Sequence, residues 1–228
     1  MFLDSIRQAL GLLASAEVWS IILRSVEVSG TAVAVAAVIG IPLGVLIGLA
    51  RFPGRGAVVA VINTGMALPP VVVGLIVFMI LSRSGPLGSL QLLYTKQAMV
   101  LAQLVLAVPL VLGITVSGIG GIPREVLMQA KSLGAGRLQL ALAALNEAKL
   151  TLVLAIIAGM GRIIAEVGAV MMVGGNFKGE TQVMTTTILE EVRKGEYALG
   201  LALGIILLTI ALAANAVMSR IQGGVMTR

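Results

Sequence analysis

Residues 118–150 read GIGGIPREVLMQAKSLGAGRLQLALAALNEAKL, a charged segment between two long apolar stretches. Pro123 suits the first turn of a helix, and apolar side chains recur after it at mostly helical spacings. Gly134 and Gly136 interrupt this pattern. We therefore predict two short helices joined by a glycine bend, a compact knob that fits a groove of another protein because glycine permits close approach. The alternative is an ordinary amphipathic helix resting on the bilayer.

The composition around this segment is that of a membrane protein. Apolar residues make up 58% of the 228 residues and charged residues 11%, which leaves too little polar surface to cover a soluble globule. The chain contains no Cys and no His, so disulfides, thiolate nucleophiles, imidazole bases and the commonest metal ligands are unavailable. We expect an all-α membrane protein that is not an enzyme and holds no metal or cofactor. Aromatic residues total 3% and interleave with no basic stripe, so nucleic acid is not an expected partner.

Five apolar stretches are long enough to cross a membrane. They cover residues 21–50, 57–81, 97–117, 151–173 and 197–218.

The flanking segments complete the predicted organisation. Residues 1–20 carry one apolar face at helical spacing, which predicts an amphipathic helix on the membrane surface that ends near Trp19 as an interfacial anchor. A frayed terminus is the alternative. Residues 21–219 form the predicted transmembrane domain, and residues 220–228 a cytoplasmic tail.

Charge indicates the orientation of the predicted spans. Five crossings put the termini on opposite sides. The side that holds residues 118–150 carries eight basic and two acidic residues, a net charge of +6, whereas the other side carries seven of each. The positive-inside tendency places the +6 side in the cytoplasm. We expect a multi-pass protein of a prokaryotic plasma membrane with its N-terminus outside and its C-terminus cytoplasmic.

Pro69 and Pro70 interrupt the second predicted span. Neither proline supplies an amide hydrogen, and both restrict the preceding residue, so the helix must kink or break there. Inside a membrane such a break is tolerated only where neighbouring helices or a water-lined cavity satisfy the freed carbonyls. The break is therefore expected to point inward, either as a packing kink or as part of a pathway.

Ionisable and polar residues near the fourth span are further candidates for a pathway or gate. Arg162 and Glu166 lie four residues apart, which on one helix would put them on one face and allow them to pair. We favour a structural or gating salt bridge over direct substrate contact, because the glutamate would cancel the field of the arginine. Beyond the span, Asn176 and the threonines at 185–187 could donate hydrogen bonds to an oxyanion or belong to a solvated loop.

The charged segment resembles the coupling loop of binding-protein-dependent ABC transporter permeases. Ala130 and Gly134 match a pattern of Glu-Ala-Ala, three residues and Gly, which continues nine residues later as Ile-x-Leu-Pro. Met128 and Gln129 stand where that pattern has Glu and the first Ala, and residues 144–147 (ALNE) stand where it has Ile-x-Leu-Pro.

Other segments are similar to the permease subunit of tungstate transporters, which looks like a branch of the molybdate, tungstate and sulfate permeases. The resemblance covers about residues 20–217, and its more discriminating parts are SRSGPLG, which starts at Ser82, and LNEAK. The segments that carry it are residues 66–75, 82–95, 145–149, 161–176 and 195–216.

The resemblance implies a type I ABC importer permease fold and an assembly of two copies of this chain with two cytoplasmic ATPase subunits and an extracytoplasmic oxyanion-binding protein. It also implies that Ala130 and Gly134 contact the ATPase, with Leu133 as an apolar neighbour. No G-x-x-x-x-G-K-[ST] occurs in the chain, so ATP is not expected to bind here in the usual phosphate-cradling loop. The expected function is ATP-driven tungstate import.

Two alternatives remain open at this point. Molybdate or sulfate could replace tungstate as the substrate of the same kind of permease. A secondary transporter or channel would need no ATPase, and it would be favoured by an internal repeat with paired broken helices. The sequence shows no convincing repeat between its two halves.

Overall fold

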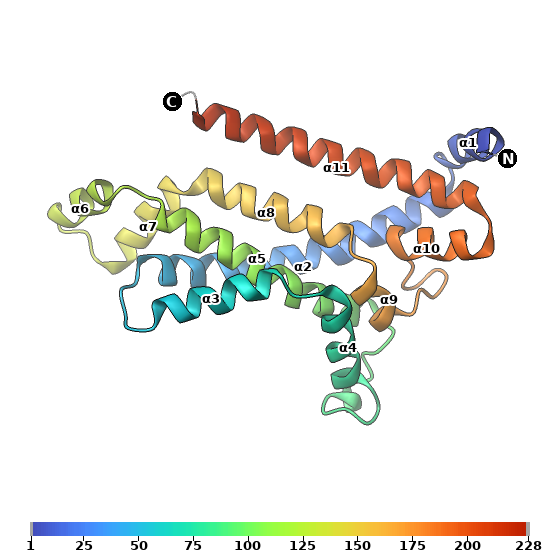
Figure 1. Ribbon diagram of the computed structural model, residues 1–228, viewed down its shortest axis with the longest axis horizontal. Coiled ribbons are helices and arrows are strands. Elements are labelled where there is room, and N and C mark those ends of the chain that lie inside the picture. Colours follow the sequence, from blue (N-terminus) through green and yellow to red (C-terminus); the bar gives the residue numbers. More distant parts are fainter. Residues whose placement is uncertain (1, 227–228) are drawn as a thin grey trace.

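The computed structural model describes residues 2–226, and in this part of the chain the regular structure is entirely helical (Figure 1). The elements are α1 (Phe2–Leu12), α2 (Ala16–Leu49), α3 (Arg55–Met66), α4 (Pro70–Leu81), the short 3-10 helix η1 (Gly88–Leu90), α5 (Lys96–Gly120), α6 (Arg124–Ser132), α7 (Arg137–Glu147), α8 (Lys149–Ile164), α9 (Gly168–Gly174), α10 (Met184–Lys194) and α11 (Tyr197–Met226).

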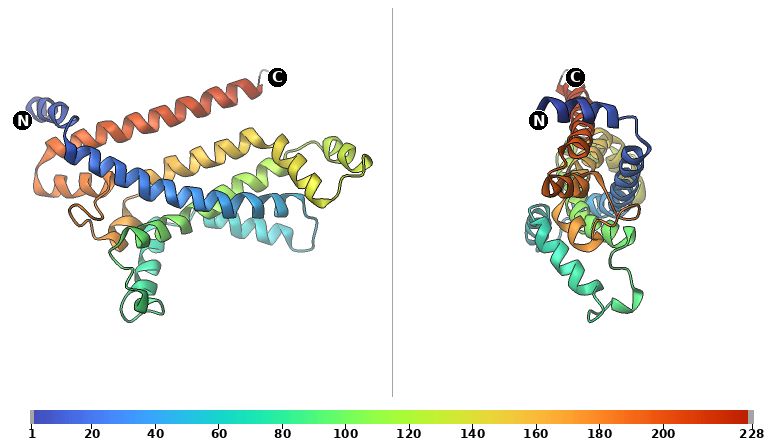
Figure 2. Two further views of the ribbon diagram at one scale, coloured as in Figure 1. Left: turned by 180° about the vertical axis from the view of Figure 1, so that it is seen from behind. Right: turned by 90° about the vertical axis from the view of Figure 1, so that its right-hand side faces the viewer.

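The long helices α2, α5, α8 and α11 run roughly along the longest dimension of the molecule (Figure 1). The beginning of the chain lies at one end of this axis, while the far end of α11 and the protruding pair α6 and α7 lie at the other. The charged segment and the end of α11 therefore share one end of the bundle, as five crossings would require. By contrast, α4 projects away from the long axis in both Figure 1 and Figure 2.

The centre of the bundle is the close contact of α2 with α5. Gly44 and Gly48 of α2 face Thr115 and Ile119 of α5, and a Cβ at either glycine would lie 2.6 Å from those side chains. The two backbones approach this closely because the glycines contribute no side chain. Thr115 is fully buried, and its hydroxyl donates to the carbonyl of Val111, 2.7 Å away, so the buried donor is satisfied.

Three helices, α2, α5 and α11, are each long and apolar enough to cross a membrane, and the number rises to five if two bent helix pairs each count as one span. One of these pairs is α3 and α4, which meet at 93°. The predicted interruption at Pro69 and Pro70 is thus confirmed: α3 ends at Met66, and α4 begins at Pro70.

The prediction of a continuous fourth span over residues 151–173 is wrong. Helix α8 ends at Ile164 and α9 begins at Gly168. Local polar bonds replace the helical ones: the amide of Glu166 donates to the carbonyl of Ile163, 3.1 Å away, and the carboxylate of Glu166 accepts from the amide of Ala169, 3.0 Å away. The chain leaves the helix here without a proline.

The predicted segment boundaries at the two ends of the chain also need correction. The first helix, α1, ends at Leu12, and the hydroxyl of Ser15 accepts from the amide of Val18 to start α2. Trp19 therefore belongs to α2, where it is 54% exposed. At the other end α11 continues to Met226, so most of the predicted tail is helical.

Candidate functional site

The turn between α6 and α7 explains why a glycine stands at position 134. Gly134 has φ +83°, a left-handed conformation that strains other residues. Its amide donates to the carbonyl of Lys131, 2.9 Å away, and the next amide, of Ala135, donates to the carbonyl of Ala130, 3.0 Å away. These two bonds form a Schellman motif, which ends α6 and turns the chain toward α7. The predicted helix pair with a glycine bend is confirmed.

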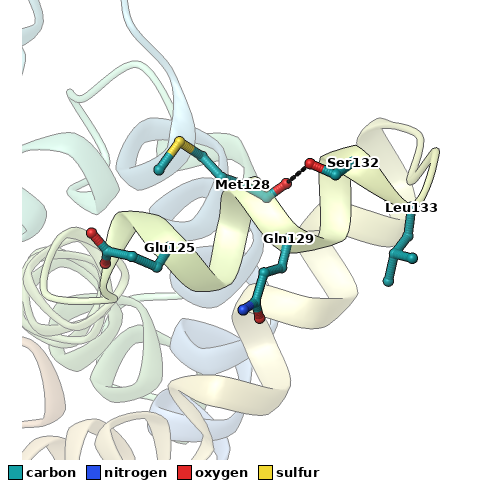
Figure 3. Close-up of a pocket in the computed structure, with 5 residues that line it drawn as sticks. All are labelled: Glu125, Met128, Gln129, Ser132 and Leu133. Carbon is teal, nitrogen blue, oxygen red and sulfur yellow. Dashed lines mark hydrogen bonds between the residues drawn. The ribbon is translucent and has the colours of Figure 1, made fainter.

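The outer surface of this helix pair exposes large apolar side chains among charged ones, and no other described element covers it. Leu133 is 89% exposed and Leu138 is 73% exposed. A shallow, mostly apolar depression of about 480 Å³ lies along α6 and is lined by Glu125, Met128, Gln129, Ser132 and Leu133. Figure 3 shows Gln129 and Leu133 projecting to one side of α6, while Ser132 turns back to donate to the carbonyl of Met128, 3.0 Å away. Such a surface suits docking into another protein.

The inner side of the same segment is fixed to the bundle. Ala144 of α7 and Ala148 at its junction with α8 pack with Ile119 and Ile122, at the end of α5, and with Val45 of α2. Ala144 is fully buried there. Helix α8 begins directly at Lys149, so α7 continues into α8 through a bend of 67° while this apolar cluster fixes it to α2 and α5.

The two broken segments lie side by side. A Cβ at Gly74 of α4 would lie 2.7 Å from the Cα of Ala169, and a Cβ at Gly168 would lie 2.7 Å from a methyl group of Val71. Helix α4 is thus packed on α9, and Pro70 lies at the start of one helix while Glu166 caps the start of the other. The structure brings the candidates Pro69, Pro70 and Glu166 into one region.

Arg162 does not lie in this group, and the predicted salt bridge between Arg162 and Glu166 is not formed among the described residues. Arg162 is exposed near the end of α8, whereas Glu166 lies beyond that helix and is half-buried. Among the described residues no ion pair joins them. The expected pairing required four residues of continuous helix, and the break after Ile164 removes it.

Residues 177–180 of the polar stretch after α9 are exposed, but Asn176 and the three threonines at the start of α10 bond within the protein. The hydroxyl of Thr185 donates to the carbonyl of Glu166, 2.8 Å away, and thereby holds the break. The hydroxyl of Thr186 donates to the side-chain oxygen of Asn176, 2.6 Å away, and Thr187 bonds to the carbonyl of Val183. All three threonines are buried. In this conformation they donate to protein acceptors rather than to an anion.

Asn176 also binds the carboxylate of Glu190, which continues into a charged network on α10. Lys194 lies 2.7 Å from Glu190 and 3.0 Å from Glu191. The hydrogen bond from Lys194 lowers the pKa of the Glu190 carboxyl, and the two glutamates raise the pKa of the Lys194 ammonium group above its ordinary value. This network holds α10 against the turn at Asn176, which has φ +55°.

One group of residues was not anticipated from the sequence. Arg55, Asn63 and Ser117 are the polar residues in the otherwise apolar or glycine lining of a pocket of about 270 Å³ between α3 and α5, at the end of the bundle that carries α6 and α7. In the sequence Arg55 is only one of the basic residues on the side with a net charge of +6. The signal that could have found the pocket is the spacing of eight between Arg55 and Asn63, which places both on one face of α3.

These features define a class: an all-α membrane protein with broken helical segments and a protruding helix pair that exposes apolar side chains at one end. The family model described as "Binding-protein-dependent transport system inner membrane component" matches residues 40–226. The chain belongs to this family, with the all-α fold of type I ABC importer permeases. Members of this kind are transport subunits, and ATP is hydrolysed by a separate ATPase.

Named relatives cover nearly the whole chain. It is 44% identical to the tungstate uptake system permease protein TupB of Peptoclostridium acidaminophilum, over 96% of this chain and 97% of that one. It is 41% identical to a probable anion ABC transporter permease protein of Haloferax volcanii, over 89% and 90%. A solved bacterial ABC transporter that imports the acidic polysaccharide alginate shares the fold, with a TM-score of 0.75 and 20% identity over 94% of this chain and 83% of that one.

Proposed function

We propose that this chain is the permease subunit of an ATP-driven, binding-protein-dependent importer of tungstate. The observation that carries the proposal is the 44% identity, over 96% of this chain, to a permease named for tungstate uptake. The relative named only as an anion permease supports the broader class of substrate. The absence of Cys and His removes many catalytic designs and agrees with a transport role for this chain.

The proposed assembly contains a second copy of this chain, two cytoplasmic ATPase subunits and an extracytoplasmic oxyanion-binding protein in a prokaryotic plasma membrane. The N-terminus lies outside, and the C-terminus lies in the cytoplasm with α6 and α7. The net charge of +6 on the side of the docking loop supports this orientation. The exposed apolar side chain of Leu133 and the turn from Ala130 to Gly134 support docking to the ATPase.

The proposed mechanism is a two-state equilibrium that partners bias from both ends of the bundle. Closure of the ATPase pair moves α6 and α7, and the apolar cluster around Ala144 passes this movement to α2, α5 and α8. The paired breaks at Pro69, Pro70 and Glu166 are the proposed gate, because backbone without regular helical bonding can rearrange at lower cost than a continuous helix. Asn176 positions the segment next to this gate, and Arg162 is a pathway candidate on its exposed side.

Uptake with competing oxyanions tests the substrate. Cells that lack their own tungstate and molybdate importers are supplied with this permease, its ATPase and its binding protein, and intracellular tungsten is measured by mass spectrometry. We expect accumulation that excess sulfate does not suppress and that molybdate suppresses less than unlabelled tungstate does. Equal or stronger suppression by molybdate or sulfate would assign the permease to that oxyanion instead.

A secondary transporter is the second candidate, and one observation favours it. Two broken helical segments pack side by side, as α4 and α9 do here, in some transporters that need no ATP. The membership of the chain in the binding-protein-dependent family argues for the ATP-driven alternative. Uptake that persists in the same cells without the ATPase subunit would support the secondary transporter.

A further inference from the structure

We propose that Arg55, Asn63 and Ser117 form a subsite for a tetrahedral oxyanion at the cytoplasmic end of the permease, an inference that rests on the proposed function. The pocket lies between two helices that pack along much of their length, α3 and α5. Arg55 and Asn63 are eight residues apart on one face of α3, and Ser117 faces them from α5.

The arginine is held in place for this role. The Nε of Arg55 donates to the carbonyl of Ile47, 3.0 Å away, near the end of α2. This bond fixes the plane of the guanidinium group, while its two terminal nitrogens have no partner among the described residues. A guanidinium fork that is already oriented loses less freedom when it binds an oxyanion.

The other two donors, Asn63 and Ser117, are exposed, and neither bonds back to its own helix as nearby threonines do. Thr64, next to Asn63, donates to the carbonyl of Ala60, and Thr115, close to Ser117, donates to the carbonyl of Val111. In the described part of the chain, neither the Asn63 amide nor the Ser117 hydroxyl has such a partner. Two donors that face a pocket and do not bond back to their own helix remain available to a ligand.

The chemistry of the lining selects an anion. It offers a guanidinium group, an amide and a hydroxyl, and no carboxylate lines the pocket. Oxygens of a doubly charged tetrahedral oxyanion accept charge-assisted hydrogen bonds from these donors. A volume of about 270 Å³ admits such an ion with part of its hydration shell. One guanidinium charge beside an open pocket binds an oxyanion weakly. Weak binding suits the cytoplasmic end of an importer, because the substrate must be released there.

The phosphate of a lipid headgroup shares this chemistry, so the test separates the two sources. The complex of permease and ATPase, without its binding protein, is purified in dodecyl maltoside in a phosphate-free buffer. Tungstate binding is measured by equilibrium dialysis and mass spectrometry for the wild type, Arg55→Gln and Asn63→Ala. The matched controls are Arg51→Gln, which removes the same charge from an exposed residue outside the pocket, and Thr64→Ala.

We expect Arg55→Gln to raise the apparent dissociation constant about tenfold, Asn63→Ala to raise it severalfold, and both controls to change it less than about twofold. Equal effects of Arg55→Gln and Arg51→Gln would overturn the subsite, as would the absence of saturable tungstate binding by the wild type. A loss of bound phosphatidylglycerol in Arg55→Gln, with tungstate binding unchanged, would overturn it in favour of a lipid site.

The failure of this inference can be told apart from failure of the proposed function. Wild-type cells that accumulate tungsten, together with an Arg55→Gln complex that binds tungstate as the wild type does, overturn the subsite alone. Wild-type cells that accumulate no tungsten overturn the proposed function and remove the basis of the subsite.

Discussion

Replacing Leu133 by alanine should weaken docking of the ATPase without disturbing the permease. The side chain is 89% exposed, so its truncation removes no burial from the folded chain, and the free energy of unfolding should change by less than about 0.5 kcal/mol. If docking buries this side chain, Leu133→Ala removes about 2 kcal/mol of apolar contact, which corresponds to about a 30-fold increase in the dissociation constant.

The assay is binding of the purified ATPase to the permease in lipid nanodiscs, measured by surface plasmon resonance. Leu212→Ala is the matched control, because Leu212 is also a leucine that is 70% exposed, but it lies on α11, away from the turn between α6 and α7. The control should bind like the wild type. Wild-type affinity of Leu133→Ala, or an equal loss in both variants, would refute the reasoning that this surface docks the ATPase.

Three further changes probe the break, the bundle and the turn. Thr185→Val removes the hydroxyl that bonds across the break between α8 and α9, and it should lower the free energy of unfolding by about 1–3 kcal/mol. It should also reduce uptake more than Thr187→Val, whose lost hydrogen bond is local. Equal effects of the two variants in thermal unfolding and uptake assays would argue against a role of Thr185 in holding the break. Gly44→Ala places a Cβ 2.6 Å from a buried threonine and should lower the free energy of unfolding by about 1–3 kcal/mol, measured by thermal unfolding. Gly30→Ala, whose Cβ meets no atom within 4 Å, should be neutral or stabilising. An equal loss of stability in both variants would contradict the close packing of α2 on α5. Gly134→Val should strain the turn by about 1–2 kcal/mol and lower ATPase stimulation by the loaded binding protein, and unchanged stimulation would show that the left-handed turn is not required.

Breaks and turns that are caused by a residue at the same position in the sequence could be predicted. Pro69 and Pro70 lack amide hydrogens, so the break between α3 and α4 follows from covalent chemistry. Gly134 interrupts a helical pattern and does adopt a left-handed conformation. The matched pattern named Ala130 and Gly134, and the structure supplies the reason for Gly134, because the Schellman motif needs a left-handed residue there.

Where the cause was tertiary, prediction from the sequence failed. The break at Glu166 contains no proline and is held by Thr185, a residue 19 positions later that no periodicity connects to it. The Arg162–Glu166 pair was inferred from helical spacing, which does not apply across a break. Arg55 and Ser117 come from helices far apart in sequence, and an apolar pattern does not reveal which faces of two helices meet.

ATP-dependent tungstate accumulation in proteoliposomes tests the central claim most directly. The permease is reconstituted with its ATPase and its oxyanion-binding protein, and tungsten inside the vesicles is measured with and without ATP on the ATPase side. We predict accumulation against a gradient that requires ATP and all three components and that falls in Leu133→Ala but not in Leu212→Ala. Accumulation without ATP, or none with every component present, would contradict the account.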